Sequence, residues 1–94
     1  MTYRLKLHKR FLEHVEIHKR AGNKILIKKI ETLIAEIKEH PRTGTGTGKP
    51  EQLKHFTNDI WSRRIDAKHR LIYEIIENEL IIIVISAYGH YDDK

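Results

Sequence analysis

Apolar and polar positions follow a strand pattern and then two helix patterns in the first half of the chain. From Thr2 to Leu7 apolar residues alternate with polar or charged ones, which is the period-two pattern of a half-buried strand. Residues 9–20 carry apolar side chains among charged ones and predict a short helix. The clearest pattern runs from Lys24 to His40, where apolar residues recur at spacings of three and four along one face. This pattern predicts a second helix with Asn23 as its N-cap and Pro41 at its end.

The second half of the chain predicts strands. Asp59–Ile65 and Arg70–Ile76 are strand-like, and a polar hairpin turn at Asp66–His69 separates them. A second turn at Glu77–Glu79 precedes Leu80–Ile85, which is apolar at every position, as expected for a central strand covered on both faces. Helices followed by hairpins predict an α+β domain, in which two N-terminal helices pack on a small, mostly antiparallel sheet.

A run of alternating threonine and glycine, from Thr43 to Gly48, joins the two halves. Alternating glycines suggest a phosphate-binding loop at first. However, no strand leads into the run, and Lys49-Pro50 follows it instead of a helix, so the context of a P-loop is absent. We interpret the run as a flexible connector.

Length and composition limit the class of protein. The 94 residues predict a single domain, 1–94, and the absence of cysteine excludes disulfides and thiolate metal sites and fits a reducing cytoplasm. The longest apolar stretch, Leu80–Ile85, is far shorter than the ~20 residues of a membrane-spanning helix, and the N-terminal residues lack the apolar core of a secretory signal. We therefore expect a soluble, cytoplasmic protein with no membrane partner.

The charge balance points to an anionic partner. Lys and Arg total 18 against 13 Asp and Glu, which gives a formal charge of +5 and a pI near 9.6. Such a surplus on a small domain suggests nucleic acid, an acidic protein or a membrane surface as the partner. The plainer alternative, that the charge only aids solubility, is left open by composition.

Residues suited to phosphodiester cleavage gather after the glycine run. They comprise the carboxylate of Glu51, several cations including Arg64 and Arg70, and the pair His90-Tyr91 beyond the last predicted strand. A base can take a 2′-hydroxyl proton, cations can stabilise charge on the phosphate, and an acid can protonate the departing 5′-oxygen.

Each of these residues also has a plainer interpretation. Glu51 could form only a solvated ion pair beside Lys49 and Lys54. His90 could be an ordinary surface histidine and Tyr91 a packed terminal aromatic, while strand arginines often pair with acids across a hairpin. Composition and spacing leave the catalytic and the plain interpretations open.

The strand pleat separates the neighbouring residues Arg63 and Arg64. Successive side chains of a strand point to opposite faces, so Arg63 shares a face with Trp61 and Ile65, and Arg64 shares the other with Ser62 and Ile60. The face of Trp61 and Ile65 has the character of core. We therefore expect Arg63 to support the structure and Arg64 to be the better phosphate ligand.

Four motifs in a fixed order carry a resemblance to a known family. They are Gly-Lys-Pro-Glu-Gln-Leu-Lys-His at 48–55, Trp-Ser-Arg-Arg-Ile at 61–65, His-Arg-Leu-Ile-Tyr at 69–73 and His-Tyr at 90–91. Together they resemble the YoeB/Txe family of toxins from type II toxin–antitoxin systems, within the RelE-like superfamily. Gln52 departs from the family, where proline is common at this position. The resemblance implies a RelE-like form of the α+β fold.

The resemblance also implies an activity and its catalytic residues. The protein would be a ribosome-dependent endoribonuclease, an mRNA interferase, that cleaves translated message by 2′-hydroxyl attack and leaves a 2′,3′-cyclic phosphate and a 5′-hydroxyl. Glu51 would be the general base and His90 the general acid. Arg64 would bind the scissile phosphate, and Tyr91 would orient the reacting groups or stack on a base.

RNA-binding residues and partners follow from the same resemblance. Arg70 would assist at the phosphate, and Lys49 and Lys54 would bind the RNA backbone. The family's chemistry requires no metal or other cofactor. The implied partners are the ribosome with its messenger RNA and a YefM/Axe-like antitoxin as inhibitor; operator DNA would be bound only through the antitoxin complex, and a homodimer is allowed. The rival hypotheses are a non-catalytic RNA- or ribosome-binding module of the same fold and a basic protein-interaction domain.

Overall fold

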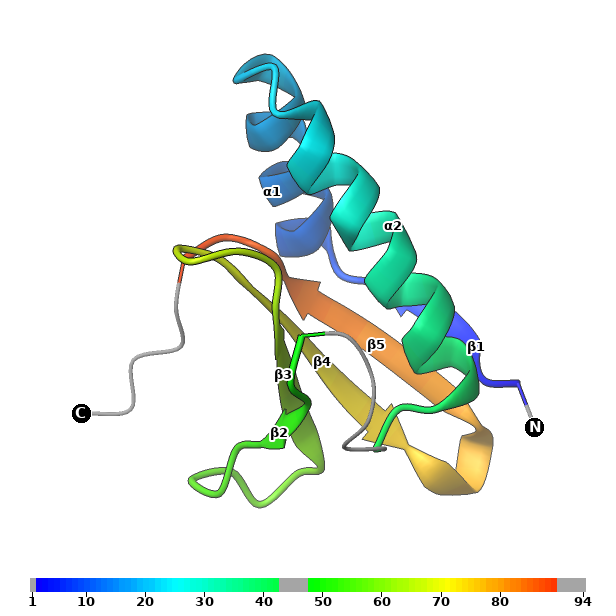
Figure 1. Ribbon diagram of the computed structural model, residues 1–94. Coiled ribbons are helices and arrows are strands. Elements are labelled where there is room, and N and C mark those ends of the chain that lie inside the picture. The colour runs from blue at the N-terminus through cyan, green and yellow to red at the C-terminus, as the bar shows by residue number, and fades with distance from the viewer. Residues whose placement is uncertain (1, 43–47, 90–94) are drawn as a thin grey trace.

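Two helices pack on one face of a five-stranded sheet in the computed structural model, which describes residues 2–42 and 48–89 (Figure 1). The sheet order is β1-β5-β4-β3-β2; neighbouring strands are antiparallel except β1 and β5, which are parallel. This arrangement confirms the predicted α+β fold. The elements are β1 (Arg4–Leu7), α1 (Lys9–Arg20), α2 (Lys24–Glu39), β2 (Glu51–Gln52), β3 (Ile60–Arg64), β4 (Arg70–Ile76), the 3₁₀ turn η1 (Glu77–Glu79) and β5 (Ile81–Ser86).

Both helices begin at the predicted residues, and their ends agree with the prediction to within one residue. The side chain of Asn23 accepts a hydrogen bond from the Leu26 backbone N–H at 3.2 Å, which confirms it as the N-cap of α2. The helix ends at Glu39, one residue before the predicted end, because His40 already leaves the helical conformation ahead of Pro41. None of the described helices is long and apolar enough to cross a membrane.

The core lies between the two helices and one face of the sheet. The apolar stripe of α2, which includes the fully buried Leu33 and Ile37, packs in one cluster with Tyr73 of β4 and Val84 of β5. Tyr73 and Val84 are paired across the strands and therefore share the face that the helices cover. Each fully buried side chain of this size contributes about 1.5–3 kcal/mol relative to an exposed one.

The prediction that the last strand is covered on both faces was wrong in part. Ile82 and Val84 of β5 are fully buried toward the helices, whereas Ile81, Ile83 and Ile85 on the other face are only half-buried. Both helices pack on the same side of the sheet, so the opposite face, here called the open face, has no helix over it among the described residues. Continuous apolar sequence indicated an interior strand but did not show how many layers cover it.

The turn between β3 and β4 is held by one carboxylate. The Asp66 carboxylate accepts hydrogen bonds from the backbone N–H groups of Lys68 and His69, both at 2.8 Å. Partial burial opposes ionisation of this group, but the two hydrogen bonds hold the pKa of Asp66 below its ordinary value. The predicted hairpin turn at Asp66–His69 is therefore confirmed, with β3 one residue shorter at each end than the predicted Asp59–Ile65.

Candidate active site

The strand register places the candidate residues of three strands on the open face. Glu51 of β2 is paired with Ser62 of β3, and Arg64 of β3 is paired with Arg70 of β4. Directly paired residues point to the same face, and Ser62 and Arg64 are two apart in one strand. The open face therefore carries Glu51, Arg64 and Arg70 together, with Glu51 and Arg64 as diagonal neighbours, a relation that spans roughly 7–8 Å.

Arg63 lies on the opposite face and is fully buried, as expected. Its guanidinium forms an ion pair with the Glu36 carboxylate of α2 at 2.9 Å and donates to the His40 carbonyl at 2.6 Å. It also donates to the Tyr73 hydroxyl at 3.2 Å. Burial raises the pKa of Tyr73, and the neighbouring Arg63 opposes that shift. Arg63 thus joins α2 to the sheet, which confirms the assignment of the two arginines to opposite faces.

The side chain of Arg64 is exposed and forms no ion pair with any residue that the structure describes. Its backbone N–H donates to the Gly48 carbonyl at 2.7 Å, which fixes Gly48 against the end of β3. A Cβ atom on Gly48 would lie 2.6 Å from the Arg64 carbonyl oxygen, and the φ of Gly48 is +85°. Only glycine fits here without displacing the backbone that carries Arg64. By contrast Ser62 and Ile60, predicted to share this face, are buried.

Glu51 and Arg70 are in contact on the open face. The Nη1 atom of Arg70 lies 3.6 Å from the Glu51 carboxylate and donates to the Ser62 hydroxyl at 3.2 Å. The ion pair therefore joins Glu51, the predicted general base, to Arg70, the arginine predicted to assist at the phosphate. It is not the pairing with Lys49 or Lys54 that the plain interpretation of Glu51 expected, since both lysines are exposed and form no ion pair within residues 2–42 and 48–89.

The chain that leads to His90 reaches the same end of the sheet. Gly89 accepts a hydrogen bond from the Arg70 backbone N–H at 2.9 Å, and its own N–H donates to Nδ1 of His69 at 2.8 Å. The residue before His90 is thus fixed beside the first residue of β4. His90 and Tyr91, the predicted acid and its neighbour, lie outside the described residues, as does most of the Thr-Gly run.

Asp59 was missed as a positioning residue, although it holds the strand that carries Glu51. Its carboxylate accepts hydrogen bonds from the Trp61 indole at 2.7 Å, from the Gln52 amide at 3.1 Å and from the Arg42 guanidinium at 2.6 Å. Gln52, the departure from the family pattern, therefore anchors β2 through its side chain. Partial burial lowers the pKa of Arg42, but its hydrogen bonds to the Glu77 and Asp59 carboxylates outweigh this effect and raise the pKa above its ordinary value. β2 itself was not predicted, because two residues are too few to show a period.

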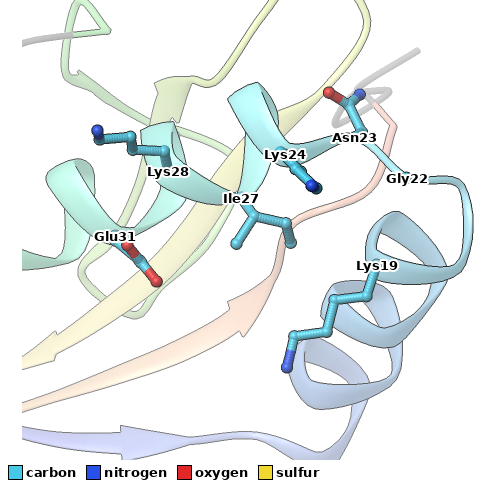
Figure 2. A pocket seen from close by; sticks show the side chains of 7 residues that line it. All are labelled: Lys19, Gly22, Asn23, Lys24, Ile27, Lys28 and Glu31. Atoms are coloured by element: carbon cyan, nitrogen blue, oxygen red, sulfur yellow. The ribbon is translucent and has the colours of Figure 1, made fainter.

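A separate hollow of about 360 Å³ lies at the turn between α1 and α2 (Figure 2). Its lining includes Lys19, Lys24 and Lys28 together with Asn23 and Ile27. None of the predicted site residues within 2–42 and 48–89 lines it, so the hollow is separate from the described part of the candidate site.

Comparison with known proteins defines first the class of fold. A chain of the archaeal RelE–RelB complex from Pyrococcus horikoshii superposes with a TM-score of 0.75 at 18% identity, covering 95% of this chain and 96% of that one. At that identity the match establishes the fold alone, which is RelE-like. The YoeB/ParE toxin from Agrobacterium tumefaciens superposes with a TM-score of 0.82 at 33% identity, covering 94% of this chain and 99% of that one.

Sequence comparison then defines the family. The model of a YoeB-like toxin of bacterial type II toxin–antitoxin systems matches residues 7–91. Toxin YoeB from Synechocystis is 45% identical over 70 residues, which are 74% of this chain and 77% of that protein. The chain therefore belongs to the family of YoeB-like toxins, as the four motifs indicated.

Two structures from Staphylococcus aureus show this family in assemblies. The YoeB dimer superposes with a TM-score of 0.80 at 29% identity, and YoeB in the YoeB–YefM complex with 0.75 at 32% identity. Each match covers 97% of this chain and 100% of the other.

Proposed function

We propose that this chain is a ribosome-dependent endoribonuclease, an mRNA interferase, that cleaves translated messenger RNA without a metal ion or other cofactor. The observation that carries the proposal is the arrangement of side chains on the open face. The Glu51 carboxylate lies 3.6 Å from the Arg70 guanidinium, and the exposed Arg64 is the residue of β3 that pairs with Arg70. A carboxylate and two cations on one accessible surface suit RNA cleavage better than RNA binding alone, because binding gains nothing from the negative charge.

In the proposed reaction, Glu51 removes the proton of a ribose 2′-hydroxyl, and the oxygen attacks the adjacent phosphorus. The bond from phosphorus to the 5′-oxygen breaks, and His90 donates a proton to this leaving group. One proton is taken and one is delivered, and the products are a 2′,3′-cyclic phosphate and a 5′-hydroxyl. Tyr91 orients the reacting groups or stacks on a base.

The cations have different tasks in this proposal. Arg64 binds the scissile phosphate and stabilises the charge that develops on it, an interaction that typically contributes 10²–10³-fold to the rate. Arg70 assists at the phosphate and orients the Glu51 carboxylate, as their 3.6 Å contact supports. Lys49 and Lys54, both exposed, bind the RNA backbone.

The family supplies the proposed partners. YoeB of Staphylococcus aureus occurs in a complex with YefM and as a dimer. For this chain we propose a YefM/Axe-like antitoxin as inhibitor and a homodimer as an accessible state. The ribosome and its messenger RNA are the proposed cytoplasmic target, and operator DNA is bound only through the antitoxin complex.

Glu51→Gln and His90→Gln test the proposed chemistry, because each removes a proton-transfer group and keeps size and hydrogen bonding. Single-turnover cleavage of message on loaded ribosomes, at saturating protein, should fall by about 10²–10⁴-fold in each variant. Binding to ribosomes should change little, since it depends mainly on lysines and arginines that contact phosphates.

Glu31→Gln and His40→Gln are matched controls, since both residues are exposed and lie on or after α2, away from the open face. If Glu51→Gln and His90→Gln cleave within a few-fold of the wild type, the assigned roles are wrong. Wild-type protein that binds loaded ribosomes without cleaving message would instead support the non-catalytic module of the same fold.

A further inference from the structure

Four aromatic rings from three separate segments form a cluster at the chain that follows β5. His14 and His18 lie on α1, His69 ends the β3–β4 turn, and Tyr88 belongs to the segment after β5. Ring centroids are 4.8 Å apart for His18 and His69, 4.8 Å for His69 and Tyr88, and 5.5 Å for His18 and Tyr88. His14 lies 5.6 Å from Tyr88. We call these four residues the histidine clamp.

Each histidine of the clamp makes a hydrogen bond to the backbone of residues 87–89. Nδ1 of His14 accepts from the Ala87 N–H at 3.1 Å, and Nδ1 of His69 accepts from the Gly89 N–H at 2.8 Å. Nε2 of His18, whose side chain is buried, lies 2.9 Å from the Ala87 carbonyl oxygen. These bonds fix the segment at both ends, and the Arg70 N–H adds a bond to the Gly89 carbonyl at 2.9 Å.

The partners determine which ring nitrogens carry protons. A backbone N–H can only donate, so Nδ1 of His14 and Nδ1 of His69 must be unprotonated and both rings must be neutral. A carbonyl oxygen can only accept, so Nε2 of His18 donates. Adding a proton to Nδ1 of His14 or His69 would place two donors against each other and break the bond.

We propose that the histidine clamp holds Ala87–Gly89, the segment that leads to the proposed general acid, in the form needed for cleavage, and that protonation of His14 or His69 releases this segment. The proposal rests on the function proposed above, in which His90 is the general acid. The three histidines contact this segment through its backbone, and they are therefore positioning residues.

The surroundings of His14 favour its neutral form. On α1, Arg10 and the neighbouring His18 face His14, with Glu13 opposing them; Asp66 of the turn faces His69 and His18. Burial, followed by Arg10 and His18, lowers the pKa of His14 below its ordinary 6.5. The bond between His14 and the Ala87 N–H is then fully formed above pH 6.5, and it is lost as the pH falls below that value through the lowered pKa of His14 in the folded state. Cleavage should therefore decline on the acidic side, whereas the need for a protonated His90 limits it on the alkaline side.

Variants that keep the hydrogen bond but cannot be protonated test this proposal. Asparagine places its amide oxygen near the position of a histidine Nδ1, so the double variant H14N/H69N keeps both acceptors without a titrating ring. We expect single-turnover cleavage near pH 7.5 to be retained within a few-fold, and the decline below pH 6.5 to disappear. His14→Ala removes one acceptor and should lower cleavage near pH 7.5 by roughly 10–10²-fold, the size expected from an ~1 Å misplacement, with ribosome binding unchanged. His40→Asn, at an exposed histidine outside the clamp, should leave both the rate and the pH profile of the wild type.

A measurement on the isolated protein separates the clamp from the cleavage activity. The backbone amide resonances of Ala87 and Gly89 should shift between pH 7 and pH 5.5 in the wild type and stay constant in H14N/H69N. Such shifts with no cleavage by the wild type would overturn the proposed function and leave the clamp standing. An unchanged acidic decline in H14N/H69N, or amides that ignore pH in the wild type, would overturn the clamp.

Discussion

Arg63 and Arg64 are adjacent in β3, yet Arg63 is buried beneath α2 and Arg64 is exposed to solvent. The partners of Arg63 include groups of α2, of His40 after it and of β4, and its side chain is fully buried. Arg64 is exposed on the open face and is attached to its surroundings through its backbone. The comparison teaches that charge alone does not identify a functional residue: of two identical side chains, the pleat assigns one to stability and leaves the other able to bind a ligand.

The largest expected effect is on cleavage by Arg64→Ala. Loss of the phosphate ligand should lower single-turnover cleavage by about 10²–10³-fold, while the free energy of unfolding changes by less than about 0.5 kcal/mol because the side chain is exposed. Arg20→Ala is the control, since this arginine of α1 is 80% exposed and far along the chain from the site motifs. A well-folded Arg64→Ala protein that cleaves normally would remove Arg64 from the site.

Arg63→Ala should show the opposite balance. It removes the buried guanidinium that pairs with the Glu36 carboxylate and donates to the His40 carbonyl, and breaking such a buried pair costs about 3 kcal/mol or more. Arg63→Lys should recover little of the lost stability, because a single ammonium cannot reproduce the planar guanidinium that reaches Glu36, His40 and Tyr73 together. Urea denaturation measures both variants. A loss below about 1 kcal/mol, or abolished cleavage in a protein of normal stability, would reverse the assignment of the two faces.

Gly48→Ala should affect both stability and cleavage, because it displaces the backbone of β3 that carries Arg63 and Arg64. The added Cβ would lie 2.6 Å from the Arg64 carbonyl oxygen, in a residue with φ of +85°. We expect a loss of about 1–3 kcal/mol in stability together with reduced cleavage, because the end of β3 must shift. Gly22→Ala is the matched control, since its φ is +73° but no atom lies within 4 Å of the new Cβ. That variant should show only the strain of the left-handed backbone, about 1 kcal/mol, with normal cleavage per folded molecule.

The smallest expected effect is the contribution of the Glu51–Arg70 pair to stability. The Glu51 side chain is 65% exposed and the contact is 3.6 Å, so a double-mutant cycle of Glu51→Gln and Arg70→Gln should give a coupling below about 1 kcal/mol. The same cycle on Glu36 and Arg63 should give a clearly larger value, because Arg63 is fully buried. Equal couplings would mean that the open face is not the weakly stabilised side of the sheet.

The sequence by itself determined the helices, the hairpin of β3 and β4, and the opposite faces of Arg63 and Arg64. Each of these depends on a local rule: the period of apolar residues in α2, the capping side chain of Asn23, and the two-residue period of a strand. The linked motifs also identified the family, which the comparisons confirmed. The catalytic roles of Glu51, Arg64 and His90 remain predictions.

Only the tertiary structure decided which distant residues meet. The parallel pairing of β1 with β5, the contact of Arg70 with Glu51 and the single covered face of β5 have no signature in the local pattern. The histidine clamp is the clearest case, because His18 and Ala87 are separated by 69 positions and meet only after α1 packs beside β5. The physical reason is that hydrophobic period and intrinsic propensity are set by a few neighbouring residues, whereas these contacts depend on how complete helices and strands pack. That packing is determined by burial of the whole core, to which all the segments contribute.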